Sequence, residues 1–284
     1  NEHIWCQLFS EPGAGSDVAS LACKAERDGD EWILNGQKVW TTLAHISSYG
    51  LIVARTDAEV PKHRGMTAFV IDMAAPGVEV RPLRQMTGEA EYFTDVRVPD
   101  AMRVDDVGRG WAVAITTLMN ERVSIGGGTP PRNSGAIGQL LSLYRERADA
   151  SDAVTRDRFM RLWSRAEINR ITNLRASQNR RLGTPGPEGS IAKLAMADLN
   201  KAIYEVAIDL MGPEGMTYVS YEMHQPKVAL FGTDVRKNFL RARANSIEGG
   251  TTEVMKNILG ERVLGLPGDV RVDRDVAWSQ VPRN

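Results

Sequence analysis

The most informative segment for chemistry spans residues 9–17, which read FSEPGAGSD. Gly13 and Gly15 lie close to the hydroxyls of Ser10 and Ser16, so the backbone can approach a ligand with N–H and O–H donors turned towards it. The spacing differs from the dinucleotide motif G-x-G-x-x-G, and no strand-to-helix unit surrounds it, which excludes a Rossmann interpretation. Taken alone, such a segment is most often a turn between strands.

A second segment with chemical potential is VWTT at residues 39–42. The indole of Trp40 beside the hydroxyls of Thr41 and Thr42 can form a wall for a planar ring and donate a hydrogen bond to its edge. In isolation, a tryptophan in a strand is usually part of the core.

Two carboxylates have the surroundings of a general base. Glu121 stands beside Arg122 on an otherwise apolar predicted helix, where burial and neighbouring charge can tune a carboxylate. Glu248 lies in the segment SIEGGTTE at residues 246–253, where glycines and Thr251 can present backbone amides to an anion at a helix start. The alternatives are a solvated ion pair for Glu121 and an ordinary capped helix for Glu248.

The elements that must position these residues change character along the chain. Residues 1 to about 105 contain short apolar or alternating runs separated by Pro and Gly, which predict a small barrel or sandwich. Asn35-Gly36 predicts a hairpin turn within residues 31–40. The other expected strands are residues 49–55, 66–72, 78–82 and 92–98.

After Gly108 the sequence favours helices. We expect one helix from residue 111, one over residues 154–182 ended by the break at 183–189, and a last one capped by Thr251 or Thr252. Between them, one apolar stripe recurs at steps of three or four: Ile191, Ala195, Leu199, Ala202, Val206 and Leu210. The fold class is therefore α+β, with a β-barrel or sandwich domain over residues 1–107 followed by a four-helix-bundle domain over residues 108–284.

Composition narrows the function classes. The chain has 284 residues, 42% hydrophobic and 25% charged, with a formal net charge of -1, so nucleic-acid binding is disfavoured. No apolar run reaches the roughly 18 residues of a membrane span. Two cysteines, Cys6 and Cys23, are too few for a disulfide framework or a metal site. We expect a cytoplasmic protein without metal.

Together, the segments resemble the acyl-CoA dehydrogenase family, in that family's order and over nearly the whole chain. Residues 7–17, QLFSEPGAGSD, are similar to its T/S-E-P-x-A-G-S-D signature. NGQK at residues 35–38 with WTT at 40–42 resembles the flavin segment N-G-x-K-x-W-I-T/S-N. FTDVRVP at residues 93–99 resembles F-x-D-V-x-V-P, and GGTTEV at 249–254 resembles G-G-T-S/T-E-I.

The resemblance implies a β middle domain and a C-terminal helical bundle, preceded in the family by a helical N-terminal domain that we do not find in this chain. It implies FAD-dependent oxidation of an acyl-CoA thioester between Cα and Cβ, with a fatty, branched or steroid side-chain acyl group. Electron-transfer flavoprotein is the implied acceptor. The implied flavin-binding residues are Phe9, Ser10, Trp40 and Thr42, with Gly15 and Ser16 near the pyrophosphate, and Thr251 at the start of the last helix.

The resemblance leaves two candidates for the base. Glu121 matches the position that one branch of the family uses, on the helix after the β domain. Glu248 lies one residue before the loop position of the other branch, which here falls on Gly249. Arg122 matches an arginine near the substrate end of the site.

Two departures keep other functions open. RERADA at residues 145–150 lacks the family's R-x-x-F-G, and DLMGPEG at residues 209–215 replaces Q-x-x-G-G-x-G. Both segments normally serve the FAD of a partner subunit. The chain is thus expected in a homotetramer or a heterotetramer. The alternatives are an inactive or weakly active partner subunit and an acyl-CoA oxidase.

Overall fold

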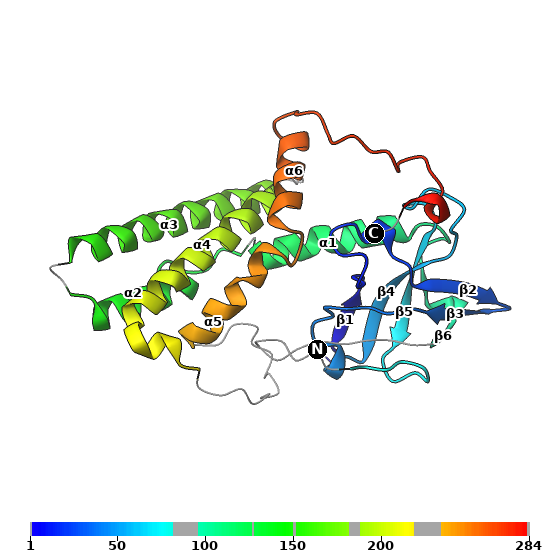
Figure 1. Cartoon of the computed structure of the whole chain (residues 1–284), viewed down its shortest axis with the longest axis horizontal. Helices are drawn as coiled ribbons and strands as arrows, with labels where there is room; N and C mark the ends of the chain where they lie inside the picture. Colours follow the sequence, from blue (N-terminus) through cyan, green and yellow to red (C-terminus); the bar gives the residue numbers. More distant parts are fainter. Residues whose placement is uncertain are drawn as a thin grey trace. The chain divides into compact units, whose positions relative to one another are not determined.

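The computed structural model describes residues 2–81, 96–126, 128–149, 152–181, 188–218 and 234–282, without the side chains of 122–126, 180–181 and 188. They form two compact units (Figure 1). The first, here the β unit, comprises Asn1–Leu118 together with Asp269–Asn284. The second, here the helical unit, is Met119–Gly268.

One mixed sheet organises the described part of the β unit. Its strand order is β6-β3-β2-β4-β5-β7, and β1 pairs in parallel with β4. The strands are β1 (Trp5–Leu8), β2 (Lys24–Asp28), β3 (Glu31–Asn35), β4 (Tyr49–Arg55), β5 (Met66–Asp72), β6 (Val96–Pro99) and β7 (Arg103–Val104).

The sheet curves around an apolar core. Trp32 on β3 and Phe69 on β5 lie with their ring centroids 5.4 Å apart although two strands separate them in the sheet. Residues of one strand face alternately into this core and out of it, as strand geometry requires, so Trp32 and Leu34 are buried on β3. The predicted barrel-like β domain is confirmed, and β4 and β5 have the predicted bounds.

The predicted hairpin at Asn35-Gly36 is wrong. The hairpin instead joins β2 to β3 through a two-residue loop in which Gly29 has φ 61°, the conformation that primed turns require. Gly36 instead follows β3, and close packing explains why this residue is a glycine: a Cβ at this position would lie 2.6 Å from the Cα of Cys23.

We predict that Gly36→Ala lowers the free energy of unfolding by about 1–3 kcal/mol, because the new methyl group has to displace the backbone at Cys23. Urea unfolding measures the change. Gly13→Ala is the matched control, since a Cβ there meets no described atom within 4 Å. Equal stability of the two variants would contradict the close-packing explanation.

Two other expected strands differ from the structure. Residues 78–81 form no strand: Val78 and Val80 contact the core singly, and the Val78 amide donates within a turn to the Ala75 carbonyl. Of the expected strand 92–98, residues 92–95 lie outside the described part, and β6 begins at Val96.

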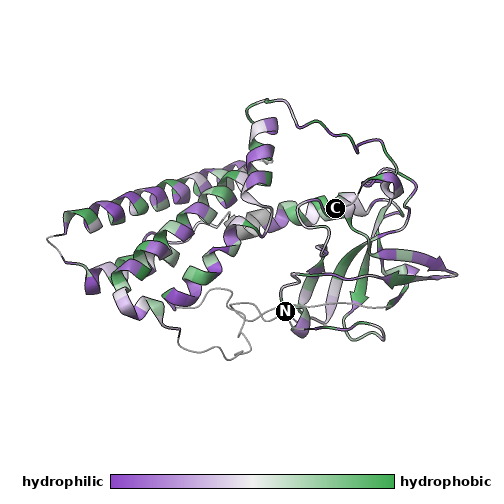
Figure 2. Ribbon diagram, viewed as in Figure 1, coloured by the Kyte–Doolittle hydropathy of each residue, from purple (hydrophilic) through white to green (hydrophobic). Residues whose placement is uncertain are grey.

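The helical unit confirms the α+β class and the C-terminal helical domain. Its elements carry hydrophilic and hydrophobic residues side by side along their length (Figure 2). The helices are α2 (Gly135–Arg147), α3 (Ala153–Arg181), α4 (Glu188–Met211), α5 (Val235–Ala242) and α6 (Thr252–Arg262), preceded by α1 (Gly110–Gly126), which begins in the β unit.

The core of the helical unit lies between α2, α3 and α4. On α4 the predicted stripe is right at Leu199 and Val206, which are buried, and wrong at Ile191, which is exposed. The deeply buried face instead includes Ile203 and Ala207. The actual face is therefore rotated by about one residue, because α4 contacts several helices rather than one.

The compact units have other bounds than the expected domains 1–107 and 108–284, which stay a prediction. The first half of α1 belongs to the β unit, since Ala114 is buried in its second core with Phe9 and Met66. The end of the chain also returns to the β unit, where Ala277 forms a bridge with Pro61.

Candidate functional site

The two ligand-like segments of the β unit are joined by a backbone hydrogen bond. The Val39 amide donates to the Ser10 carbonyl at 2.9 Å. This bond places Ser10 next to the chain that carries Trp40, Thr41 and Thr42. The structure thus brings together segments that lie about thirty residues apart in the sequence.

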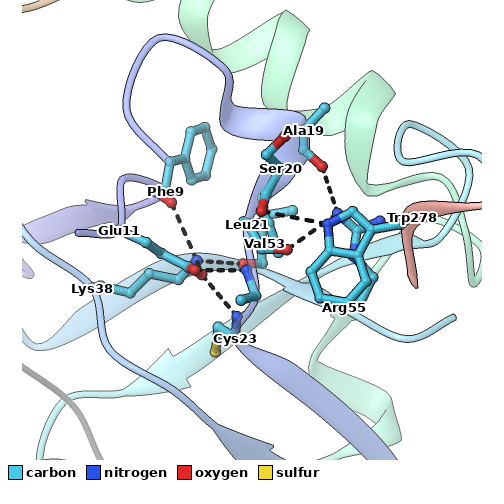
Figure 3. A network of polar contacts seen from close by, with 11 residues as sticks. Phe9, Glu11, Ala19, Ser20, Leu21, Cys23, Lys38, Val53, Arg55 and Trp278 are labelled. Carbon is cyan, nitrogen blue, oxygen red and sulfur yellow. Dashed lines mark hydrogen bonds and ion pairs between the residues drawn. The ribbon is translucent and has the colours of Figure 1, made fainter. Parts of the chain in front are cut away.

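Beneath them lies a buried ion pair (Figure 3). The Lys38 amine donates to the Glu11 carboxylate at 2.7 Å and also to the carbonyls of Phe9 and Val53. The other donors to Glu11 are the backbone amides of Ala22 and Cys23, at 2.6 and 3.0 Å. Because the charged groups of both residues are engaged in hydrogen bonds, the pair holds the two segments rigidly together.

Burial raises the pKa of the neighbouring Cys23 thiol to about 11, with a smaller lowering by Lys38 and a raising by Glu11. At neutral pH this thiol is therefore protonated, and thiolate chemistry is excluded for it.

Trp40, two residues after Lys38, has an unfavourable backbone conformation. Its φ is 60°, a left-handed geometry that costs a residue with a Cβ roughly 1–2 kcal/mol. Its side chain is nevertheless 63% exposed, so it gains little from burial in this chain. Strain of this kind is typical of functional positions. The exposed indole of Trp40 is a flat aromatic surface that a ligand can reach.

Thr41 supplies a polar group beside that surface. Its side chain is 2% exposed, and its Oγ1 has no hydrogen-bond partner among the described residues. A buried hydroxyl without a partner is costly and calls for an explanation. The next residue, Thr42, is exposed.

The glycine loop, residues 13–17, is exposed at Gly13, Gly15 and Ser16. It begins with a tight pair of backbone hydrogen bonds between Glu11 and Ala14, at 3.0 and 3.1 Å. A Cβ at Gly13 or Gly15 would meet no described atom within 4 Å, and neither has a positive φ. The fold itself therefore does not require glycine there, whereas close approach of a ligand would.

Phe9 differs from its neighbours in the expected cofactor set. Its side chain is 2% exposed and belongs to the second core of the β unit. Its carbonyl accepts from Lys38. Any contribution of Phe9 to a ligand therefore passes through its backbone, while Ser10 is half-buried at the surface of the segment.

These features fit a planar ring attached to an anionic chain. The exposed indole suits the face of the ring, the partnerless Thr41 hydroxyl suits a polar edge, and the open glycine loop suits oxygens of a diphosphate. Sequence reasoning assigned no role to Glu11 or Lys38. A charged residue inside the first ligand-like segment and another directly before the second were the available signals.

The helical unit carries the base candidates. Glu121 lies on α1 and is half-buried. Its neighbour Arg122 belongs to the same helix, but its side chain lies outside the described ones.

Glu248 has a different environment. Its Oε1 accepts from the Arg241 guanidinium at 2.9 Å and from the Asn245 amide at 2.8 Å, and its Oε2 accepts from Arg241 at 2.6 Å. Such a bidentate pair holds the carboxylate in one geometry. Glu248 is thus occupied in holding the loop between α5 and α6.

Thr251 is the N-cap of α6, as predicted, since its hydroxyl accepts from the Val254 amide at 3.2 Å. The carbonyl of Gly250 in the same loop accepts from the fully buried Lys193 amine at 2.5 Å. Thr252 Oγ1 is buried without a hydrogen-bond partner among the described residues. The cap and the lysine together fix this loop.

Within the described part of the chain, no helix is both long and apolar enough to cross a bilayer.

Family models match both parts of the chain. Residues 6–98 match the model described as "Acyl-CoA dehydrogenase, middle domain". Residues 108–264 match "Acyl-CoA dehydrogenase, C-terminal domain".

Individual proteins agree with these models. The chain is 37% identical over 272 residues to acyl-CoA dehydrogenase IpdE1 of Mycobacterium tuberculosis, with 94% of this chain and 68% of that protein covered. It is 40% identical over 271 residues to acyl-CoA dehydrogenase FadE34 of the same organism, covering 94% of this chain but only 36% of that protein. The solved ChsE4-ChsE5 complex from that organism superposes with a TM-score of 0.78 at 29% identity, covering 94% of this chain and 70% of that one.

Proposed function

Because the chain belongs to the acyl-CoA dehydrogenase family, we propose that it takes part in the FAD-dependent oxidation of an acyl-CoA thioester between Cα and Cβ. The observation that carries this proposal is the strained and exposed Trp40, held beside Ser10 by the Val39–Ser10 hydrogen bond. An aromatic wall with this cost and no packing gain is accounted for by a bound flavin ring.

The β unit would hold the cofactor. Trp40 would stack on the ring, while Ser10, Thr41 and Thr42 would donate to its polar edge. Gly15 and Ser16 would meet the diphosphate through amides and a hydroxyl. When bound, FAD would supply the oxidising power for the reaction, as the acceptor of the hydride lost from Cβ.

The chain's own contribution to the chemistry is proton removal. We assign Glu121 as the base that takes the α-proton, because a half-buried carboxylate on a helix can be both positioned and tuned. Arg122, the next residue, would lie at the substrate end. Glu248 supports the loop instead, since Arg241 and Asn245 engage both of its oxygens. Thr251 would contribute to the cofactor site from the end of the loop that leads into α6.

We expect the purified protein to bind FAD and to lose its yellow band on anaerobic addition of a suitable acyl-CoA. Trp40→Ala should weaken FAD binding about 5- to 150-fold, the loss of a ring-stacking contact worth about 1–3 kcal/mol. Fluorescence of free FAD measures the affinity, and Trp5→Ala, another exposed tryptophan, is the matched control. Binding that is equally strong in Trp40→Ala would contradict the assigned flavin wall.

A second candidate is a partner subunit that lends its fold to an active homologue. Here the two segments that depart from the family pattern contact each other: Arg147 at the end of α2 forms an ion pair with Glu214 at 2.7 Å. This pairing supports a subunit that does not reach a partner's FAD, and ChsE4-ChsE5 is a complex of two named chains. A protein that stays colourless with FAD until a homologous subunit is added would favour this candidate.

The remaining proposals concern assembly and partners. Ile168, Ile171 and Leu174 form an exposed apolar stripe on α3, which supports a homotetramer or heterotetramer through the helical unit.

Electron-transfer flavoprotein is the proposed electron acceptor, and the cytoplasm is the proposed location. Hydrogen peroxide formed without an acceptor would instead indicate an oxidase. Comparing fatty, branched and steroid side-chain thioesters as substrates identifies the acyl group.

A further inference from the structure

The end of the chain is anchored to the β unit by one buried aromatic residue. Trp278 is 7% exposed and lies against the Arg55 guanidinium, whose Cζ is 4.8 Å from the ring centroid. Its backbone amide donates to the Val60 carbonyl, and the next amide, of Ser279, donates to Ala58. Residues 277–280 are thus part of the β unit's fold.

Arg55 connects Trp278 to the residues that follow the glycine loop. Its guanidinium donates to the carbonyls of Ala19 and Leu21, at 2.5 and 3.2 Å, and to that of Lys62 at 2.6 Å. Figure 3 shows the Trp278 ring beside Arg55 on the side of the residues that follow the loop. Because Trp278 covers the guanidinium, it keeps water from competing for these hydrogen bonds.

A second connection reaches the glycine loop directly. The Lys62 amine lies between two carboxylates, 2.6 Å from Asp17 Oδ2 and 2.5 Å from Asp273 Oδ2. Lys62 is 9% exposed, whereas Asp17 is 53% exposed. Asp17 also accepts from the Ser20 hydroxyl at 2.5 Å and directly follows Ser16. The end of the loop is thus tied, through one lysine, to the returning end of the chain.

We propose that Asp273 and Trp278 are positioning residues of the cofactor site: Asp273 through Lys62, and Trp278 through Arg55, hold the glycine loop in the geometry in which Gly15 and Ser16 meet the FAD diphosphate. This inference rests on the proposed function. The other end of the glycine loop, before Gly13, is already fixed by the Glu11–Lys38 pair. The loop is therefore held at both ends while its glycines stay open to a ligand.

The test compares Asp273→Asn and Trp278→Leu with the unaltered protein for FAD and for riboflavin, which lacks the diphosphate. Each variant should bind FAD about 2- to 30-fold more weakly, the range for residues that act on a site without touching the ligand. Riboflavin affinity should stay unchanged, because the Trp40 wall is not involved. The ³¹P resonances of bound FAD should shift, while its visible spectrum at saturation should stay the same.

The matched control is Asp275→Asn, which removes the same charge from an exposed position two residues further along the chain. Asp273→Glu keeps the charge and should retain the FAD affinity of the unaltered protein. A parallel loss of FAD and riboflavin affinity would overturn the inference in favour of general destabilisation. Unchanged FAD affinity in both variants would overturn it while leaving the proposed function standing. An unaltered protein that binds no FAD would overturn both.

Discussion

Replacing Glu121 by Gln should lower the rate of flavin reduction by about 10²–10⁴-fold, the loss expected when a positioned base is removed. The amide is nearly isosteric with the carboxylate, and glutamine favours helices about as well as glutamate. Folding and FAD binding should therefore be retained. Anaerobic stopped-flow absorbance with saturating acyl-CoA measures the rate.

Glu248→Gln is the matched control for this prediction. It removes the other candidate carboxylate by the same atomic change, but it breaks the pair with Arg241. We expect reduction within about tenfold of the unaltered rate, below the loss expected for a base, together with a lower melting temperature. If Glu121→Gln reduces at the unaltered rate while Glu248→Gln does not react, the base is in the loop and our assignment fails.

Lys38→Met should lower the free energy of unfolding of the β unit by about 3–5 kcal/mol, because it leaves the Glu11 carboxylate buried without its counter-charge. FAD binding should also fall, since Lys38 joins the segments that carry Ser10 and Trp40. Urea unfolding followed by the fluorescence of tryptophan reports the first effect, and FAD titration at low temperature reports the second.

Two further variants separate charge from packing. Adding Glu11→Gln to Lys38→Met removes both charges and should recover much of the lost stability, as is common when a buried pair is replaced rather than broken. Arg161→Met breaks the exposed pair with Asp157 on α3, whose side chains are 77% and 61% exposed, and should change stability far less. Equal losses for Lys38→Met and Arg161→Met would show that the buried pair has no special role.

Much of the fold could be predicted from local signals. Short apolar or alternating runs predicted the bounds of β4 and β5. A cap at Thr251 or Thr252 was expected because hydroxyl residues are typical of helix starts, and Thr251 is the cap. The hairpin prediction failed because Asn35-Gly36 has the composition of a turn. Gly36 is there for a contact with Cys23, which the β2–β3 register brings next to it beyond the Lys24–Asn35 pair. A turn rule that considers only Asn35-Gly36 does not include this contact.

The candidate site shows the same limit. Sequence reasoning selected Ser10, Gly15 and Trp40 from their types, but it gave no role to Glu11 or Lys38, whose pairing depends on the sheet. It also had no means of linking Asp17 to Asp273 through Lys62, because more than two hundred residues separate the carboxylates. Such contacts arise from tertiary structure, which short-range patterns do not encode.

The central claim, oxidation between Cα and Cβ, is tested most directly by the mass of the thioester after anaerobic incubation with the FAD-loaded protein. The account predicts a product lighter by two hydrogens, an α,β-unsaturated thioester, formed in proportion to the flavin bleached. FAD that binds normally but leaves every fatty, branched and ring-bearing thioester unchanged in mass would contradict the claim.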